Sequence, residues 1–328
     1  MAVIGDEFDH YRHCFYSSPH TTAGYLPQSL QTQLFGGRTA ITSYLDVYRA
    51  IFPERGGYRH DLLRERTELT VEQRLREPLN GDSHLMFILS GLRACVSYQV
   101  RPDPVYFVDL DGMFADTPRN RTTVLVSYNN EIEVARTSLH VPVSTHPIEA
   151  VSLKDPRYGL HEQLGDFIAR HATGKGRLKM ELAPDEQNAC LTVNEYETLL
   201  MRHDLTDVLR EPFRFAAEKA RHVWNDPSAV PQKARAYAKY DLVQALNQLV
   251  DVLGLPTFRI EQWVARALTV PVERLFGVKR SIDLLVSDEN PPGYTAIVEG
   301  TYQSPILIQW RTTASLARTV NVSLTQFI

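Results

Sequence analysis

Three histidines are the residues of this sequence whose types and settings most directly suggest chemistry: His20, His60 and His84. They stand in the segments Pro19-His20-Thr21-Thr22, Tyr58-Arg59-His60-Asp61 and Asp82-Ser83-His84. Neutral imidazole is a common protein ligand for zinc and similar ions, and three histidines leave a coordination position for water or substrate. We therefore predict one shared divalent-metal site of the catalytic kind, with zinc as the first expectation and iron or manganese as alternatives.

Two acidic residues lie close to these histidines in the sequence. Asp61 follows His60 directly, and Asp82 precedes His84 by two positions. A carboxylate there could orient an imidazole, supply a fourth ligand, or act as a general base toward a metal-bound water, whose pKa falls to about 7. We predict catalytic roles for Asp61 and Asp82, with solvated loop carboxylates as the alternative.

The ligand set has alternatives as well. His10 and His13 lie near His20 in the sequence and could replace it. For His20 itself, the competing interpretation is a turn histidine without a ligand role. The neighbouring threonines, Thr21 and Thr22, could hydrogen-bond the second ring nitrogen of His20, as a metal ligand requires.

Composition narrows the class of protein. The 328 residues are 43% hydrophobic and 23% charged, which favours two domains, each with its own core. The net charge of −4, without a stripe of lysine and arginine, favours a small-molecule partner over nucleic acid or a membrane surface.

Cys14, Cys95 and Cys190 are too few and too widely spaced for a disulfide framework. With no signal peptide and no apolar run of membrane-spanning length, we expect a cytoplasmic protein.

Hydrophobic periodicity predicts strands and helices in both halves of the chain. Residues rich in β-branched and aromatic types predict strands at 105–110, 124–128, 177–182, 281–286, 295–298, 305–310 and 319–324. Apolar residues at helical spacing predict helices at 42–52, 158–171, 205–224 and 240–253, and one that starts at an N-cap, Ser83, and runs through residue 89. Prolines from 142 to 156 interrupt the pattern, so we predict domains at 1–139 and 140–328.

The two halves contain a divergent internal repeat. Residues 19–23 align with 185–189, and residues 84–91 align with 270–277. Each half then runs through strands to an arginine-led strand, at 121–125 in the first and 318–322 in the second. The order of the matching segments is the same in both halves.

These segments resemble the YjbQ-like family, also called the secondary thiamine-phosphate synthase family. Its members share a histidine-led HTSA or HTTA segment leading to an asparagine-glutamate pair, a tyrosine-x-histidine, a histidine at a helix start, a GTWQ strand and a late arginine strand. The first half keeps the histidine motifs at 20–23, 58–61 and 83–85 and an arginine segment at 118–121. It has Pro27-Gln28 at the asparagine-glutamate position and shows no GTWQ.

The second half has the complementary part of the pattern. It carries the asparagine-glutamate pair in residues 191–195 and Gly300-Thr301-Tyr302-Gln303 at the GTWQ position, while Glu186, Tyr240 and Val270 stand where the histidines would be. The resemblance implies an α+β fold made of two divergent repeats of a mixed β-sheet domain with flanking helices. The first repeat would bind the metal, and the second would be degenerate with a helical insertion near 205–239. The resemblance also implies a homo-oligomer.

The resemblance further implies a pocket to which both halves contribute. Substrate-binding residues are expected at Thr192, Asn194, Glu195, Thr301, Tyr302 and Gln303, with ordinary strand and turn chemistry as the alternative. Arg119 could clamp an anion together with Arg121, because alternate residues of a strand face the same side. A solvated arginine pair is the alternative. His203 matches the same family stretch, but we interpret it as a helix-surface histidine.

The leading hypothesis is a metal-dependent enzyme that acts on a polar, phosphorylated or heterocyclic small molecule. Thiamine-phosphate synthesis is the named activity of the resembled family, and another, specialised biosynthetic reaction or metal-assisted hydrolysis are alternatives within the same class. From a different class, the chain could be a non-catalytic binding or scaffold protein whose metal is structural or absent. The metal content of the purified protein would help to distinguish the metal-dependent enzyme from the binding or scaffold protein.

Overall fold

The computed structural model describes residues 10–34, 38–100, 104–114, 117–171, 174–225, 276–289 and 292–328. The predicted helix at 240–253, Tyr240, Val270 and the last part of the predicted insertion lie outside these ranges. The described helices are α1 (Gln28–Gln33), α2 (Arg38–Ile51), α3 (Val71–Arg76), α4 (Gly81–Leu89), the π-helical turn η2 (Leu200–Asp204), α5 (Leu160–His171), α6 (Leu205–Arg210) and α7 (Pro212–Asn225).

Antiparallel strands make up the rest of the regular structure. They are β1 (His13–Ser17), β2 (Ala23–Tyr25), β3 (Cys95–Gln99), β4 (Phe107–Asp109), β5 (Met113–Phe114), β6 (Thr117–Pro118), β7 (Val124–Tyr128), β8 (Glu131–Pro142), β9 (Glu149–Ser152), β10 (Gly176–Leu182), β11 (Ala189–Asn194), β12 (Ser281–Glu289), β13 (Pro292–Val298), β14 (Ser304–Gln309) and β15 (Ala317–Phe327). The protein is therefore of the mixed α+β class, as predicted. The two divergent repeats remain a prediction.

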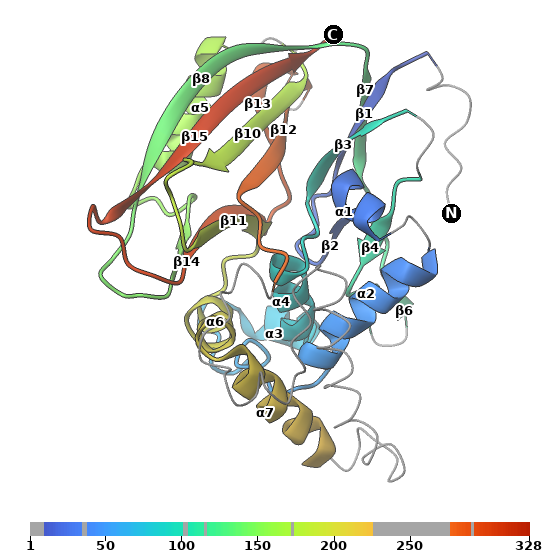
Figure 1. The fold of residues 1–328 in the computed structure, drawn as a ribbon, viewed down its shortest axis with the longest axis vertical. Helices are drawn as coiled ribbons and strands as arrows, with labels where there is room; N and C mark the ends of the chain where they lie inside the picture. The colour runs from blue at the N-terminus through green and yellow to red at the C-terminus, as the bar shows by residue number, and fades with distance from the viewer. Residues whose placement is uncertain are drawn as a thin grey trace.

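The largest sheet has the strand order β13-β12-β10-β15-β8, and its long strands occupy the upper part of Figure 1. Alternate residues of β15, Val320, Val322 and Leu324, are buried, as in a sheet with one face toward the core. Helix α5 contacts β8 and β13 and buries residues at helical spacing, Leu160, Leu164, Phe167 and Ile168. The amphipathic helix predicted at 158–171 is confirmed.

Two smaller sheets position the candidate site. Strands β3-β1-β7 form one and β11-β14-β9 the other, while α2, α4, α6 and α7 lie below the sheets in Figure 1. Every residue of β11 and of β14 is buried. Helix α4 contacts β11, and this contact brings a helix of the first half against a strand of the second.

The hydrophobic core is continuous across the predicted domain boundary. One cluster of buried side chains contains Phe15 and Leu85 as well as Leu178 and Leu307. Residue 140 lies inside β8, which pairs with β15 from Glu131 to Pro142. The division into domains at 1–139 and 140–328 stays a prediction.

Two local predictions are wrong. Helix α4 begins at Gly81 after Asn80, so Ser83 is not its N-cap but lies in its first turn, where the Ser83 hydroxyl donates to the carbonyl of Leu110. Strand β7 begins at Val124, so no strand runs through Arg119 and Arg121. Within the described ranges, no helix is both long and apolar enough to cross a membrane.

Candidate functional site

Helix α4 carries His84 into the interior, where the side chain is 2% exposed. Nδ1 of His84 lies 2.7 Å from Oδ1 of Asn194, at the end of β11. The same oxygen accepts the backbone N–H of Glu195 at 2.9 Å, and Nδ2 of Asn194 donates to the carbonyl of Thr21 at 2.8 Å. These bonds identify the oxygen facing His84, so Nδ1 of His84 carries the proton and Nε2 keeps its lone pair.

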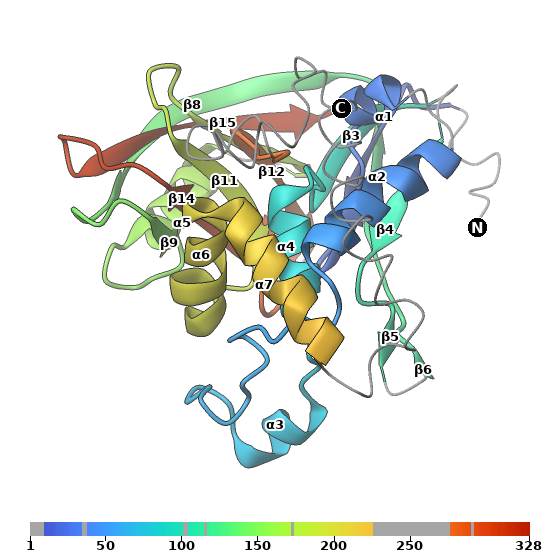
Figure 2. The same ribbon diagram turned by 60° about the horizontal axis from the view of Figure 1, so that its bottom comes forward.

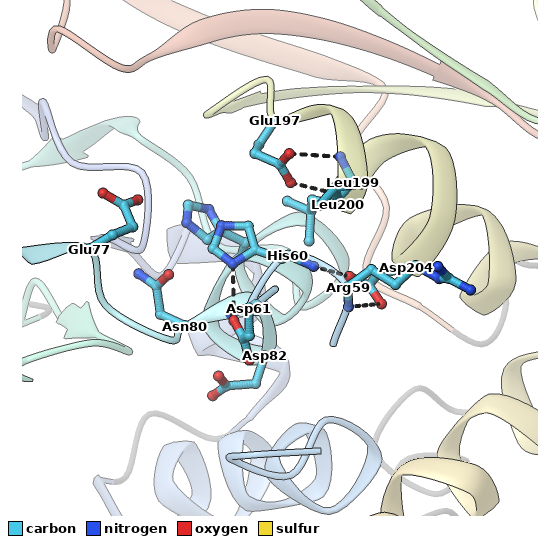
Figure 3. A network of polar contacts seen from close by, with 12 residues as sticks. Arg59, His60, Asp61, Glu77, Asn80, Asp82, Glu197, Leu199, Leu200 and Asp204 are labelled. Atoms are coloured by element: carbon cyan, nitrogen blue, oxygen red, sulfur yellow. Dashed lines mark hydrogen bonds and ion pairs between the residues drawn. The ribbon is translucent and has the colours of Figure 1, made fainter. Parts of the chain in front are cut away.

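His60 is completely buried, and its ring centroid lies 5.0 Å from that of His84. Nδ1 of His60 donates to Oδ1 of Asp61 at 3.1 Å, and that oxygen also accepts the backbone N–H of Gly81 at 3.1 Å. The carboxylate of Asp61 thereby connects the His60 turn to the start of α4, as Figure 3 shows for the bond to His60. When the His60 ring is neutral, Nε2 is left as its acceptor nitrogen.

The backbone of the His60 turn is held by the π-helical turn η2. The carboxylate of Asp204 accepts the backbone N–H groups of Arg59 at 3.0 Å and of His60 at 2.9 Å (Figure 3). Glu197 directly precedes the helical segment, and its carboxylate accepts the N–H groups of Leu199 and Leu200 (Figure 3). Single π-helical turns often occur at functional sites. Here the turn places the buried carboxylate of Asp204 against the backbone of His60.

A buried arginine completes the site. Arg66 is 1% exposed, and its Nη1 lies 3.4 Å from Nε2 of His60. Nη2 of Arg66 donates to Oε1 of Glu195 at 3.1 Å, while Oε2 of Glu195 lies 3.8 Å from Nε2 of His84. The Glu195 side chain is 19% exposed, so it connects the buried imidazoles to solvent.

The electrostatics differ between the two imidazoles. Burial, followed by the positive charge of a protonated His60, lowers the pKa of His84 to about 3, so His84 stays neutral. Burial opposes charge on His60 as well, but the hydrogen bond and charge of Asp61 outweigh it and raise the pKa of His60. Burial and the nearby Asp61 raise the pKa of Asp82 to about 7, and burial raises the pKa of Glu195 against the opposing charge of Arg66.

His20 is oriented differently from the other two predicted ligands. Its Nε2 lies 3.1 Å from the carbonyl of Thr122, toward which it donates. The loop around it is held by Gln303, whose Nε2 donates to the carbonyls of Ser18 at 2.8 Å and of His20 at 3.0 Å. Of the alternative ligands, His13 stacks on the ring of Tyr128, and His10 is exposed.

The donor chemistry of the site fits a divalent ion at His60, His84 and Glu195. Both imidazoles donate Nδ1–H to an oxygen and keep Nε2 as the ligand atom, which is the usual arrangement behind a metal-bound histidine. Two imidazoles with a carboxylate suit zinc, iron or manganese. Among the described residues, however, no three histidine, cysteine, aspartate or glutamate side chains are arranged so that they could hold a metal ion together.

The predicted substrate-binding residues divide into three groups. Asn194, Glu195 and Gln303 lie in or beside the site, as described above. Thr192 is fully buried in β11, and its Oγ1 has no hydrogen-bond partner within the described residues. Thr301 and Tyr302 lie on an exposed turn, where Tyr302 is 64% exposed.

The predicted anion clamp is already paired with carboxylates of the chain. Arg119 forms an ion pair with Asp111, and Arg121 forms a two-pronged pair with Asp109 at 2.8 and 3.0 Å. Asp111 also accepts from Nδ2 of Asn80 at 2.8 Å, which links Arg119 to the residue before α4. An anionic ligand of Arg119 would have to compete with Asp111.

Three residues of the site, Arg66, Glu197 and Asp204, are not predicted from the sequence. Arg66 stands in the charge-rich run Arg64-Glu65-Arg66-Thr67-Glu68, which has the composition of a solvated loop. Asp204 follows His203, and the structure confirms that His203 is exposed while Asp204 is buried. The sequence does contain a sign of the burial of Asp204, because Asp204 shares a helical face with the apolar residues Leu200, Met201 and Leu205. A carboxylate buried on an apolar face needs a hydrogen-bond partner.

Comparison with known proteins gives weak similarities. No protein-family model matches the chain, and no curated protein matches it. It is similar to the crystal structure of a YbjQ-like protein of unknown function from Sulfolobus solfataricus, with 15% identity over 60% of this chain and 99% of that chain and a TM-score of 0.30. An uncharacterised conserved protein of the YjbQ family from Clostridium acetobutylicum gives 12% identity, 60% and 100% coverage, and a TM-score of 0.28.

A hypothetical protein from Aeropyrum pernix K1 gives 15% identity, 59% and 98% coverage, and a TM-score of 0.29. The solved structures to which the chain is similar thus include proteins named YbjQ-like or YjbQ. At these TM-scores the similarity carries no argument about function, metal or assembly.

Proposed function

We propose that this chain is a metal-dependent enzyme whose divalent ion would be held by Nε2 of His60, Nε2 of His84 and the carboxylate of Glu195. The observation that carries the proposal is the pair of fixed tautomers. Asp61 and Asn194 each accept an Nδ1 proton, so in the neutral rings, which lie 5.0 Å apart, both Nε2 atoms are available as ligands, and an ion would displace the Nε2 proton of a protonated His60. His20 would join the ligands after its ring turns away from the carbonyl of Thr122.

The low pKa of His84 supports a ligand role over a proton-transfer role. An imidazole with a pKa of about 3 is neutral throughout the physiological range and binds metal without first losing a proton. It is correspondingly a weak general base. When bound, the ion would polarise a substrate oxygen or supply an acidic water.

Two carboxylates have the properties for positioning and for proton transfer. Asp61 orients His60 through Nδ1 and also holds the first residue of α4. Asp82, with a pKa of about 7, can take up or release a proton near neutral pH. We assign Asp61 the positioning role and Asp82 the acid-base role.

For the substrate we propose a polar small molecule, phosphorylated or heterocyclic, that approaches through the partly exposed Glu195. Asn194 and Gln303 would shape the adjoining loop, and Arg119 would supply positive charge after exchanging Asp111 for the anion. Membership of the YjbQ-like family, its origin as a tandem duplication, a homo-oligomer and a specialised biosynthetic role belong to the same proposal. The contact between α4 and β11 supports one site built from both halves.

The test is the metal content of the full chain. Chelator-treated protein is titrated with Zn²⁺, Mn²⁺ and Fe²⁺, and we expect one ion per chain for at least one of them. His84→Ala should lose that ion, whereas His203→Ala, which removes an exposed histidine, should keep it. No saturable binding in the unaltered chain, or the same stoichiometry in His84→Ala, contradicts the proposal.

The alternative is a non-catalytic binding or scaffold protein. One finding favours this alternative: in the described part of the chain, no three potential ligands are arranged so that they could hold a metal ion. Under this alternative, the histidines serve to join the two halves. A metal-free protein with His84→Ala affected only in its stability would support it.

A further inference from the structure

A positively charged side chain occupies the space between the proposed ligands. The guanidinium of Arg66 is 1% exposed and lies 3.4 Å from Nε2 of His60 and 3.1 Å from Oε1 of Glu195. Nε of Arg66 donates to Glu68 at 2.7 Å, and Nη1 donates to Glu77 at 3.1 Å. The guanidinium therefore contacts one imidazole nitrogen and three carboxylates.

These partners are the kinds of atoms that a divalent cation also binds. An imidazole lone pair and carboxylate oxygens are suitable ligands for zinc and manganese. Arginine has no acceptor atom, so it cannot itself bind these ions. Nε of Arg66 also lies 3.9 Å from a fourth carboxylate, that of Glu197. The single charge of Arg66 thus stands among four glutamates, so the carboxylates outnumber the positive charge that Arg66 supplies.

We propose that Arg66 is the resident cation of this site and competes with the divalent ion for Nε2 of His60 and for Glu195. This inference rests on the proposed function. With Arg66 in place, Nε2 of His60 and Oε1 of Glu195 contact the guanidinium and are not available to an ion. With Arg66 withdrawn, those atoms are free, and the carboxylates that held it require another positive charge.

The segment that carries Arg66 is suited to such a movement. Helix α3 and its flanking loops project from the body of the protein at the bottom of Figure 2, and α3 buries none of its side chains. Large apolar side chains on this segment are exposed: Leu62 at 43%, Val71 at 74%, Leu75 at 81% and Leu79 at 53%. Few apolar contacts therefore oppose its displacement.

The experiment compares metal binding by the full chain and by Arg66→Met. Both proteins are stripped with chelator and titrated calorimetrically with Zn²⁺ and with Mn²⁺. Loss of the competing charge should raise the affinity at least tenfold in Arg66→Met. Arg76→Met is the matched control, because Arg76 lies on α3, is 78% exposed and pairs with Glu72, away from the site. It should bind with unaltered affinity.

The outcomes separate the two proposals. Equal affinities in the unaltered chain and Arg66→Met overturn the competition and leave the proposed function standing. Binding by Arg66→Met alone supports the competition and contradicts metal dependence of the unaltered chain. Absence of binding in both proteins overturns both proposals.

A second variant and a second measurement cover the case in which Arg66→Met unfolds. Arg66→Lys keeps the charge, but a single ammonium lacks the planar fork that joins His60 to Glu195, so its metal affinity should lie between the other two. The second measurement is the thermal midpoint of Arg66→Lys with and without Zn²⁺. A rise at least twice that of the unaltered chain supports the competition, and an equal or smaller rise contradicts it.

Discussion

Oδ1 of Asn194 accepts the Nδ1 proton of His84 at 2.7 Å, across 110 positions of the sequence. This hydrogen bond joins α4 of the first half to the end of β11 in the second. Because Asn194 also donates to the carbonyl of Thr21, one amide fixes both the tautomer of His84 and the loop that carries His20. The two halves of the chain therefore depend on each other for the geometry of the site.

We predict that Asn194→Ala will weaken both the fold and the proposed metal site. The substitution leaves buried polar groups without partners, so the free energy of unfolding should fall by about 2–3 kcal/mol. Loss of a partner behind a metal-bound imidazole should lower metal affinity by roughly 10- to 100-fold. Urea unfolding and metal titration measure the two effects. Asn321→Ala, at an exposed position of β15, is the control. Equal metal affinity in both variants would contradict the role assigned to Asn194.

The buried carboxyl of Asp82 predicts an unusual dependence of stability on pH. Burial and Asp61 raise its pKa to about 7 in the folded state, above the ordinary value of 3.8. Between pH 4 and 7 the folded chain thus holds a proton that the unfolded chain has lost, so this group makes stability fall as the pH rises. Asp82→Asn should remove that fall and increase the free energy of unfolding at pH 8 by roughly 1–3 kcal/mol.

Chemical unfolding at pH 4, 6 and 8 measures this contribution. The matched control is Asp46→Asn, which removes a 58% exposed carboxylate paired with Arg49 on the surface of α2. A stability difference between Asp82→Asn and the unaltered chain that stays constant over this pH range would show that Asp82 does not carry a raised pKa.

Gly300 tests the contact between the turn before β14 and the His20 loop. A Cβ at this position would lie 1.8 Å from the carbonyl oxygen of Pro19, so Gly300→Ala must displace one of the two segments. Gln303 would then lose its bonds to that loop, and we expect a loss of about 2 kcal/mol or more in stability. Gly165→Ala, in α5 with open space around the new Cβ, should be neutral or stabilising. Equal thermal midpoints for both variants would be inconsistent with this contact.

Much of the fold could be predicted from the sequence because its signals are local. The strand at 124–128 matches β7, and the helix at 158–171 contains α5, since apolar periodicity and turn residues mark them. Ser83 misled the prediction of α4, because a serine inside the first turn can bond a distant carbonyl, here that of Leu110. The sequence predicts a strand through the arginine segment before β7, because charged residues at alternate positions give no sign of where strand pairing begins.

The candidate site could be predicted only in part, for a similar physical reason. The sequence settings single out His60 and His84, and the family pattern singles out Asn194 and Glu195, as candidates that the structure brings together. Arg66 is not predicted, because its burial depends on Glu77, Glu195 and Glu197, which approach it from other segments, whereas a local charge-rich run predicts exposure. The orientation of His20 depends likewise on a bond to Thr122, 102 positions away.

Lys279 provides a last test, of the support behind α4. Its ammonium is buried and donates to the carbonyls of Phe87 and Ile88, each at 3.0 Å, near the end of the helix that carries His84. A cation there satisfies helix-terminal carbonyls and interacts favourably with the helix dipole. Burial nevertheless lowers the pKa of Lys279 to about 7, against a raising effect of Cys190 and together with the charge of Arg93.

The folded chain therefore binds fewer protons than the unfolded chain between pH 7 and 10, so Lys279 makes stability rise with pH over this range. Lys279→Met should abolish that rise and, because two carbonyls lose their donor, should also loosen the end of α4. Urea unfolding at pH 7, 8, 9 and 10 measures the slope, with Lys175→Met as the control, since Lys175 pairs with Glu289 at the surface. A slope in Lys279→Met equal to that in the control would show that the Lys279 ammonium keeps an ordinary pKa.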